Sequence, residues 1–320
     1  ECLSAEALSA AGLNREHAGC AVVELIDISP VQAWILAARP KTLTAALAPV
    51  VTGTGLAAFH GVFAPLPALA ALIGAVFIQI GTNFANDYYD FVRGGDTDAR
   101  VGPIRVTQAG ILPPATVKRG MYAVLGAALF VGVYLVWVAG WPIVWIGLSS
   151  VACAVLYTGG PFPLAYHGLG DVFVFVFFGL VAVSGTFFVQ GLYWPPDVWI
   201  AGAALGTLNT AILVVNNLRD VDTDTLAGKR TLAVRLGATG TKIQYVLMLL
   251  VAVVVPVIGW RVYEWPLATL AALLVAPLAV APLKKVLGFA DPRELLPALG
   301  ETARIVAIYG VLLGAGLAFG

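Results

Sequence analysis

The chain has 320 residues, of which 60% are hydrophobic and only 11% are charged, and its formal net charge is zero. Soluble domains carry about 25% charged residues, so this composition, with a mean hydropathy of +0.90, excludes an ordinary soluble domain and predicts a polytopic membrane protein. The lack of net positive charge predicts no nucleic-acid partner. Cys2, Cys20 and Cys153 have no metal-ligand spacing, so we expect neither a zinc site nor a disulfide framework.

Residues 1–30 differ in composition from the rest of the chain. They open on ECLSAEALSAAGLNREHAG, which carries acidic residues and has no apolar core before a cleavage site, so we expect no signal peptide. We interpret residues 1–30 as an N-terminal extension that is partly flexible or lies at the membrane surface. Residues 31–320 are predicted to form a single transmembrane domain.

Apolar stretches of about 17–25 residues are long enough to cross a bilayer as helices. We predict nine of them, at about 43–60, 65–85, 118–138, 141–158, 171–192, 197–217, 241–259, 264–282 and 303–319. Only Ala139 and Gly140 separate the third span from the fourth, which predicts a tight helical hairpin. No alternation of strand period appears, so the predicted fold is all-α.

Basic residues are distributed unequally between the two sides of these spans. Lys and Arg occupy the flank before the first span and the regions after the second, sixth and eighth spans, whereas the other side holds only Arg261. Because positive residues mark the cytoplasmic side, we predict a cytoplasmic N-terminus in the cytoplasmic (inner) membrane. Nine spans then leave the C-terminus on the opposite side.

An acidic motif ends the second predicted span. It reads NFANDYYDFVRGGDTD over residues 83–98. Gln79, Asn83, Asn86 or Asp87, and Asp90 recur every three or four residues, which places them on one face of a helix. The helix therefore carries amides within the span and carboxylates at its cytoplasmic end.

A second acidic motif, NNLRDVDTDTLAGKR over residues 216–230, ends the sixth predicted span. Asn209, Asn216, Asp220 and Asp224 again share one helical face. Both motifs contain Asn-x-x-(Asn/Arg)-Asp, a weak internal repeat. It suggests two related helix pairs that face each other across a shared cavity.

Carboxylates at these positions indicate a divalent metal site that holds an anion such as a diphosphate. An acidic side chain at the centre of a bilayer costs about 2.5–3.5 kcal/mol, so such residues usually face a cavity and a partner. Mg²⁺ takes oxygen ligands and is commonly held by one or two carboxylates plus substrate phosphates. Each acidic helix could thus hold one ion. The alternative, that buried amides join helices by hydrogen bonds, explains the amides but not the carboxylates.

Basic residues accompany the acids. Lys229 and Arg230 follow the second motif, Arg105 follows the first in VGPIRVTQAG, and Lys41 lies in ARPKTL before the first span. Arg and Lys both bind phosphate or carboxylate. We favour this function for Lys229 and Arg105, whereas for Lys41 and Arg230 the alternative of membrane topology alone stays open.

The Gly- and Pro-rich segment LYTGGPFPLAYHGLGD, residues 156–171, joins the fourth and fifth spans on the same side. Tyr157 and Tyr166 are candidates to face a substrate ring or a developing cation. Asp171 is either a helix N-cap or an acid of the site.

These motifs together resemble the UbiA superfamily of intramembrane aromatic prenyltransferases. ARPKTL, NDYYDFVRGGDTD, VGPIR, YTGGPFPLAYHGLGD and NNLRDVDTDTLAGKRTLAVRLG occur in the order found in the branch of 1,4-dihydroxy-2-naphthoate polyprenyltransferases, which serves menaquinone synthesis. The resemblance covers about residues 38–320.

The resemblance implies nine transmembrane helices around a central cavity with cytoplasmic cap loops, and two Mg²⁺ ions that hold a polyprenyl diphosphate. The implied metal ligands are Asn86, Asp87, Asp90, Asp220 and Asp224. The implied diphosphate ligands are Lys229, Arg230, Asn83 and Asn216, and the implied acceptor contacts are Arg105, Lys41 and Tyr157. Further candidates are Asp96, Asp98, Asn217, Arg219, Tyr88 and Asp171. The superfamily's usual next acid falls on Gly94 in this chain, which brings Asp96 and Asp98 into consideration.

The reaction implied by the resemblance is transfer of the prenyl group to 1,4-dihydroxy-2-naphthoate, with loss of CO₂ and diphosphate, to give demethylmenaquinone. One alternative is a prenyltransferase of the same superfamily with another acceptor, such as 4-hydroxybenzoate, homogentisate or haem. The other alternative is a cation transporter. A transporter is expected to place its acids near the middle of discontinuous spans, whereas these acids lie at span ends.

Overall fold

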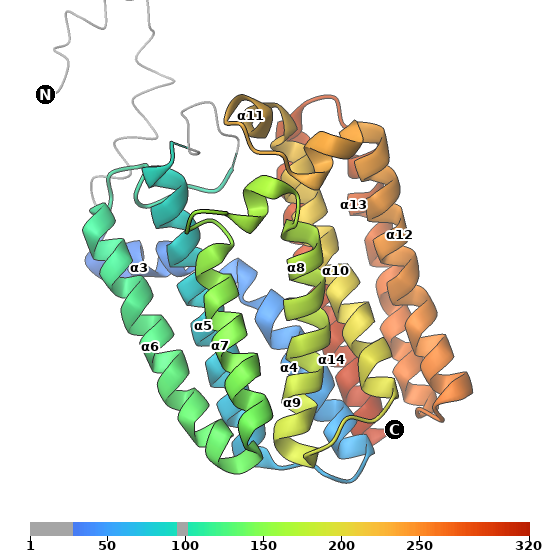
Figure 1. The fold of residues 1–320 in the computed structure, drawn as a ribbon. Coiled ribbons are helices and arrows are strands. Elements are labelled where there is room, and N and C mark those ends of the chain that lie inside the picture. The colour runs from blue at the N-terminus through green and yellow to red at the C-terminus, as the bar shows by residue number, and fades with distance from the viewer. Residues whose placement is uncertain (1–27, 95–101) are drawn as a thin grey trace, which may run out of the picture.

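The computed structural model describes residues 28–94 and 102–320, and the regular elements within them are helices (Figure 1). They form a bundle whose helices run roughly alongside one another. Most of the predicted N-terminal extension, and both Asp96 and Asp98, lie outside the described residues. The all-α prediction is confirmed.

The helical elements follow the predicted spans in order. They are α3 (Pro30–Ala38), η1 (Pro40–Thr42), α4 (Thr44–Phe59), α5 (Pro65–Val92), α6 (Pro114–Ala139), α7 (Trp141–Leu156), η2 (Leu164–His167), α8 (Gly170–Phe175), the π-helical η3 (Val176–Val181), α9 (Ala182–Gly191), α10 (Asp197–Arg219), α11 (Val221–Leu226), α12 (Leu232–Val262), η4 (Leu267–Val275), α13 (Ala276–Gly288), η5 (Pro292–Glu294) and α14 (Leu295–Phe319).

The chain is a multi-pass membrane protein. By length and composition, the described residues provide seven helical runs able to cross a membrane, or eight if the bent pair Pro30–Thr42 and Thr44–Phe59 counts as one span. Helix α7 is apolar, but with 16 residues it is shorter than any of these seven runs. The count of nine therefore stays a prediction.

A break separates α3 from α4. The two segments meet at 52°. Arg39 adopts a left-handed conformation at φ 50°, and Pro40 follows it, so the helix cannot continue. As a result α3 lies across one end of the bundle while α4 enters it (Figure 1).

Several helices extend beyond the apolar stretches that predicted them. Helix α12 starts at Leu232 rather than at about 241 and is kinked at Gly237, and α14 starts at Leu295 rather than at about 303. The reason is that hydropathy detects only the part of a helix that faces lipid or core, whereas backbone hydrogen bonding continues into polar residues. Between α6 and α7, Gly140 alone forms the link, with φ 75°, which confirms the tight hairpin.

The two ends of the bundle differ in chemistry. We call the end at which α5 and α10 finish the motif end, since both acidic motifs lie there. Exposed tryptophan side chains lie near the opposite end, namely Trp137, Trp141, Trp145, Trp194 and Trp199. Tryptophan is enriched where a membrane meets water, so this set marks a bilayer surface.

A buried polar contact ties three segments together at this opposite end. The Asp197 carboxylate lies 3.0 Å from His60 Nε2 and accepts a hydrogen bond of 2.8 Å from Trp265 Nε1. The contact joins the end of α4, the start of α10 and the turn before η4. The contact therefore stabilises the end of the bundle opposite the motif end.

Candidate active site

The two acidic motifs meet at the motif end of the bundle. Lys229 Nζ lies 3.6 Å from Asp90 Oδ1 of α5 and 3.7 Å from Asp224 Oδ1 of α11. All three side chains are largely buried, with 13% of the Lys229 side chain exposed. A single ammonium thus bridges carboxylates from the two halves of the chain, as the facing stripes of polar residues predicted.

The first motif is held by the connection between α5 and α6. Asp87 accepts hydrogen bonds of 3.1 Å from the backbone N–H groups of Val106 and Thr107. Asp90 accepts a hydrogen bond of 2.7 Å from Arg105 Nη2. The other terminal nitrogen of Arg105 donates to the carbonyl oxygen of Asn86 at 2.6 Å. Residues 105–107 therefore lie against the end of α5 and hold its acids in place.

The second motif is organised more locally. Arg219, the last residue of α10, donates to its neighbour Asp220 through Nε at 2.7 Å and Nη2 at 2.6 Å, and to Asn216 Oδ1 at 2.8 Å. Asn217 is buried beside this group. The helix is interrupted at Asp220 and resumes as α11, and this break carries Asp224 toward α5.

Asp224 lies in an environment that disfavours its charge. The pKa of its carboxyl is raised to about 6, chiefly by burial and also by the neighbouring Asp220 and Asp90 carboxylates, although the charge of Lys229 opposes the rise. A carboxylate crowded by two others is a position that a bound cation would stabilise. The crowding also shows that the three acids are close enough to act on one another.

The Gly- and Pro-rich segment forms a strap over the acids, which we define as residues 157–168. Tyr166 OH donates to Asp90 Oδ1 at 2.9 Å, and the tyrosine ring lies 4.8 Å from Lys229 Nζ. Thr158 Oγ1 donates to Asn86 Oδ1 at 3.0 Å. The strap thus contacts both α5 and the loop after α11, and closes the site on the aqueous side.

Tyr157 is the first residue of the strap and directly follows α7. Burial raises the pKa of its phenol well above the ordinary range, and the charges of Asp171, Asp90 and Asp224 raise it further. Its hydroxyl is therefore neutral and adjoins the acids. The side chain also lines the apolar cavity described below.

Asp171 is not a helix N-cap. It occupies the first turn of α8, whose N-cap position is Leu169, and its Oδ1 accepts a hydrogen bond of 2.9 Å from Gln244 Nε2 of α12. This alternative was wrong because the helix starts earlier than the sequence pattern suggests. The charge of Asp171 acts on Tyr157, as stated above.

Several candidate residues are not brought against the acids. Lys41 and Arg230 are exposed. Tyr88 packs against Tyr89 and under Lys118, on the α6 side of α5. Asn83 donates through Nδ2 to the Ala38 carbonyl and to Thr42 Oγ1. Their roles in binding substrate stay predictions.

Two contacts at the site were not predicted from the sequence. Arg39, two residues before Lys41, places Nη2 3.9 Å from Asp87 Oδ2. Thr158 of the strap contacts Asn86. The ARPKTL motif contains both Arg39 and Lys41. Nothing in the sequence distinguishes which of these two side chains points toward the acids.

The buried amides hold backbone segments of neighbouring helices. Asn209 Nδ2 donates to the carbonyl groups of Ala45 in α4 and Phe178 in η3, at 3.3 and 3.1 Å. Together with Asn83, it fastens the start of α4 into the bundle. For Asn83 and Asn209, the alternative that buried amides join helices by hydrogen bonds explains the observed contacts.

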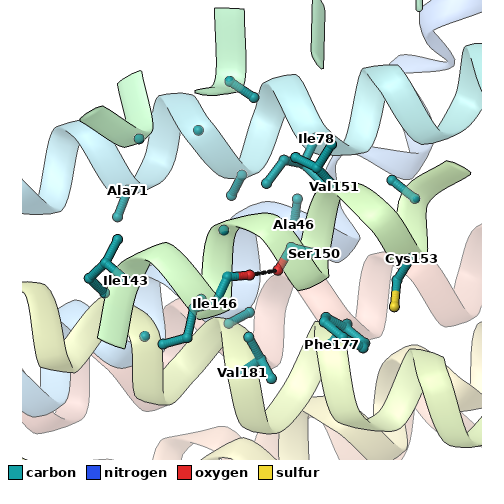
Figure 2. A pocket seen from close by; sticks show the side chains of 18 of the residues that line it. Ala46, Ala71, Ile78, Ile143, Ile146, Ser150, Val151, Cys153, Phe177 and Val181 are labelled. Atoms are coloured by element: carbon teal, nitrogen blue, oxygen red, sulfur yellow. Dashed lines mark hydrogen bonds between the residues drawn. The ribbon is translucent and has the colours of Figure 1, made fainter. Parts of the chain in front are cut away.

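An apolar cavity of about 510 Å³ lies within the bundle, and Figure 2 shows part of its lining. The positions of the lining residues along α5 and α7 extend it from below the acids toward the opposite end. Its walls come from α4 to α9. Figure 2 shows Cys153 near one end and Ala71 and Ile143 near the other. Gln79, Thr82 and Tyr157 line the end nearest the acids. The cavity has the size and lining of a site for a hydrocarbon group.

The residues at the motif end fit a divalent cation bound together with an anion. The donors are carboxylate oxygens, which Mg²⁺ prefers, and they crowd around Asp224. Among residues 28–94 and 102–320, no three acidic, histidine or cysteine side chains are grouped closely enough to hold a cation by themselves. Mg²⁺ usually completes its shell with water and substrate phosphate, and Lys229, which lies between Asp90 and Asp224, carries a charge that would attract such a phosphate.

Comparison with known proteins identifies the family. Residues 46–298 match the model of the UbiA prenyltransferase family. A curated relative from Mycobacterium tuberculosis, named 1,4-dihydroxy-2-naphthoate octaprenyltransferase, is 40% identical over 287 residues, which cover 90% of this chain and 97% of the relative. A relative of the same name from Escherichia coli is 37% identical and covers 91% and 96% of the two chains.

Solved structures of UbiA homologues share the fold at low sequence identity. A homologue from Aeropyrum pernix has a TM-score of 0.66 at 14% identity and covers 84% of this chain and 96% of its own. A homologue from Archaeoglobus fulgidus, bound to DMAPP and Mg²⁺, has a TM-score of 0.62 at 15% identity and covers 88% and 98%. The chain belongs to the UbiA prenyltransferase family, as the motifs indicated.

Proposed function

We propose that this member of the UbiA prenyltransferase family transfers a polyprenyl group from polyprenyl diphosphate to 1,4-dihydroxy-2-naphthoate. The prenyl carbon forms a bond to the ring as its bond to the diphosphate oxygen breaks, and the carboxylate leaves as CO₂. The product is the quinol form of demethylmenaquinone, because this exchange removes no electrons from the dihydroxynaphthalene ring. The observation that carries the proposal is the bridge from Asp90 through Lys229 to Asp224 above an apolar cavity. The naphthoate acceptor is supported by the names of relatives that match about nine tenths of the chain.

The donor's diphosphate is held at the motif end. Asn86, Asp87 and Asp90 would hold one Mg²⁺, and Asp220 and Asp224 would hold a second. Bound Mg²⁺ would neutralise the negative charge that develops on the leaving diphosphate. Lys229 lies between the two acidic groups and supplies a further positive charge to the same oxygens.

The prenyl carbon becomes electrophilic as its bond to oxygen breaks. The cavity excludes water from this carbon, so the ring of the acceptor is the nucleophile that reaches it. Tyr157, which is half-buried and lines the end of the cavity nearest the acids, presents its ring to the developing positive charge. Arg105 and Arg39 are placed to orient the acceptor's carboxylate, and Arg39 replaces the exposed Lys41 as the favoured cation of ARPKTL.

The orientation of the protein in the membrane follows from the distribution of its basic residues. We place the N-terminus, the acids and the strap on the cytoplasmic side of the inner membrane, and the C-terminus on the opposite side, because basic residues cluster at the motif end. Residues 31–320 then form one transmembrane prenyltransferase domain, and residues 1–30 an extension.

An acceptor panel tests the proposal. The purified protein in lipid is incubated with radiolabelled octaprenyl diphosphate and, separately, 1,4-dihydroxy-2-naphthoate, 4-hydroxybenzoate or homogentisate, with Mg²⁺ or with EDTA. We expect labelled product from the naphthoate alone, with release of CO₂, and none in EDTA. Product from another acceptor would establish the alternative prenyltransferase. No product from any acceptor, together with Mg²⁺ flux across vesicles, would favour the transporter.

A further inference from the structure

Part of the wall of the cavity beneath the acids is formed by glycines. Four glycines from four different helices line it, and we call them the glycine collar: Gly74 of α5, Gly132 of α6, Gly147 of α7 and Gly185 of α9. Each faces space that a larger side chain would fill. A Cβ atom added at Gly132 or Gly147 would meet no atom within 4 Å.

The other two members of the glycine collar are also unobstructed. A Cβ at Gly74 would lie 3.9 Å from the nearest atom, a methyl group of Val131, and one at Gly185 would lie 3.7 Å from Ile146. These are ordinary contacts. They also show that Gly74 lies level with Gly132, because Val131 precedes Gly132 on α6, and that Gly185 lies level with Gly147, because Ile146 precedes Gly147 on α7.

The collar lies well below the reacting centre. Gly74 is thirteen residues before Asp87 on α5, which at 1.5 Å per residue is roughly 20 Å along the helix. Gly147 is ten residues before Tyr157, or roughly 15 Å. Below the collar, Leu135, Ile143 and Val189 belong to a packed hydrophobic cluster that closes the cavity. The collar thus surrounds the deep part of the chamber.

A second observation indicates that a polar group of a ligand lies at the upper end of the chamber, where the tail would enter. Gln79 lines its upper end and is 6% exposed. Its Nε2 donates to Thr42 Oγ1, but its Oε1 has no hydrogen-bond partner among the described residues. Buried acceptors are rarely left unpaired without a functional reason. The remaining lining is almost entirely hydrocarbon, and Ser150 satisfies its own hydroxyl by donating to the carbonyl of Ile146 (Figure 2).

We propose that the glycine collar determines how long a prenyl tail the enzyme accepts, by leaving room for the distal isoprene units of the donor. This inference rests on the proposed function, because it assumes that the donor's diphosphate lies at the acids and its tail in the cavity. Bulkier side chains at the collar convert the deep chamber into a shallow one. Short donors then react as before, and long donors are excluded.

The chain contains a matched control on the same helix. Gly126 of α6, like Gly132, has no atom within 4 Å of an added Cβ, but it is exposed on the outer surface of the helix and does not line the cavity. Replacing either glycine by leucine raises helix propensity equally. Only Gly132→Leu reduces the cavity.

The first experiment compares donors of two lengths. Turnover of geranyl and octaprenyl diphosphate with the naphthoate is measured for the wild type, Gly132→Leu, Gly147→Leu and Gly126→Leu. We expect the two collar variants to keep geranyl turnover within about twofold and to lose at least about tenfold in kcat/KM for the octaprenyl donor, since single methylene groups in an apolar pocket already discriminate at this level. The series Gly132→Ala, Gly132→Val and Gly132→Leu should give a graded loss, and Gly126→Leu should behave as wild type.

Equal losses for both donors in a collar variant would overturn the proposal, as would an unchanged octaprenyl rate in both collar variants or the same length selectivity in Gly126→Leu. Thermal midpoints identify any variant that is merely unfolded, and the alanine variant then provides the decisive comparison.

A second experiment locates the tail without turnover. A prenyl diphosphate analogue with a photoreactive group at the end of its tail is bound in Mg²⁺ and irradiated. Labelling of α6 and α7 near the collar in the wild type, lost in Gly132→Leu, supports the inference. Labelling confined to lipid-facing residues overturns it. If the wild type turns over no donor, the proposed function fails, whereas the labelling still reports whether a tail enters the chamber.

Discussion

The two acidic motifs have similar sequences but are supported differently. Asp87 of the first accepts two backbone hydrogen bonds from the connection that follows α5, so it also organises the fold. The carboxylate of Asp224 in the second accepts no hydrogen bond from the part of the chain that the structure describes, and Lys229 Nζ approaches it only to 3.7 Å. The comparison teaches that a carboxylate of the first motif supports the fold by hydrogen bonds, whereas a carboxylate of the second has no hydrogen-bond partner in the described chain and suits the proposed cation.

The largest expected effect is at the first motif. Asp87→Ala should abolish turnover and also destabilise the protein, because the buried N–H groups of Val106 and Thr107 lose their acceptor. Each unsatisfied group costs about 1–3 kcal/mol. Turnover and the thermal midpoint in detergent, measured on the same preparation, check both effects. An Asp87→Ala protein with unchanged stability would contradict the claim that Asp87 supports the fold.

The second motif should separate activity from stability. Asp224→Asn should reduce turnover by about 100-fold or more, similar to the loss of a group that stabilises developing charge. Its thermal midpoint in EDTA should stay equal to the wild type or rise, because a crowded buried carboxylate is removed. Full activity in this variant would show that Asp224 is not part of the active site. A large drop in stability would show that Asp224, like Asp87, supports the fold.

Lys229 links the motifs, and its removal should change how the protein responds to metal. In Lys229→Met the carboxylates of Asp90 and Asp224 lose the cation between them and repel each other. We expect a lower thermal midpoint in EDTA than in the wild type, and a larger rise on addition of Mg²⁺. A Mg²⁺ response equal to that of the wild type would show that the metal does not bind between the two motifs.

The smallest effect is expected at the strap. Tyr166→Phe removes the hydroxyl that donates to Asp90 but keeps the ring next to Lys229. A net contribution of about 0.5–1.5 kcal/mol per hydrogen bond corresponds to a loss of turnover of roughly tenfold or less. Tyr166→Ala, which removes the ring as well, should lose more. Equal losses in the two variants would mean that the ring contributes nothing.

Much of this site could be predicted because helical periodicity is a local property. The spacing of Asp87 and Asp90, and of Asp220 and Asp224, predicted two polar faces, and the structure brings Asp90 and Asp224 to the same lysine. The choice between Arg39 and Lys41 could not be predicted. It depends on the left-handed conformation at Arg39 and the bend of 52° after α3, which only the packed bundle determines.

The walls of the cavity also could not be predicted, because glycine serves opposite purposes in this bundle. A Cβ at Gly55 would lie 2.3 Å from the carbonyl oxygen of Gly314, so these two residues permit close packing of α4 on α14. Gly132 and Gly147 instead leave open space. The difference lies in the neighbours, which come from distant parts of the chain, and no local pattern separates the two uses.

Binding of an unreactive donor tests most directly whether both motifs hold one metal-bound diphosphate. The probe is a prenyl diphosphate whose bridging oxygen is replaced by sulfur, titrated calorimetrically into the wild type, Asp87→Asn and Asp220→Asn, each with Mg²⁺ and with EDTA. The account predicts tight, Mg²⁺-dependent binding to the wild type and its loss in either variant. Undiminished Mg²⁺-dependent binding to either variant would contradict it, because one acidic motif would then be sufficient.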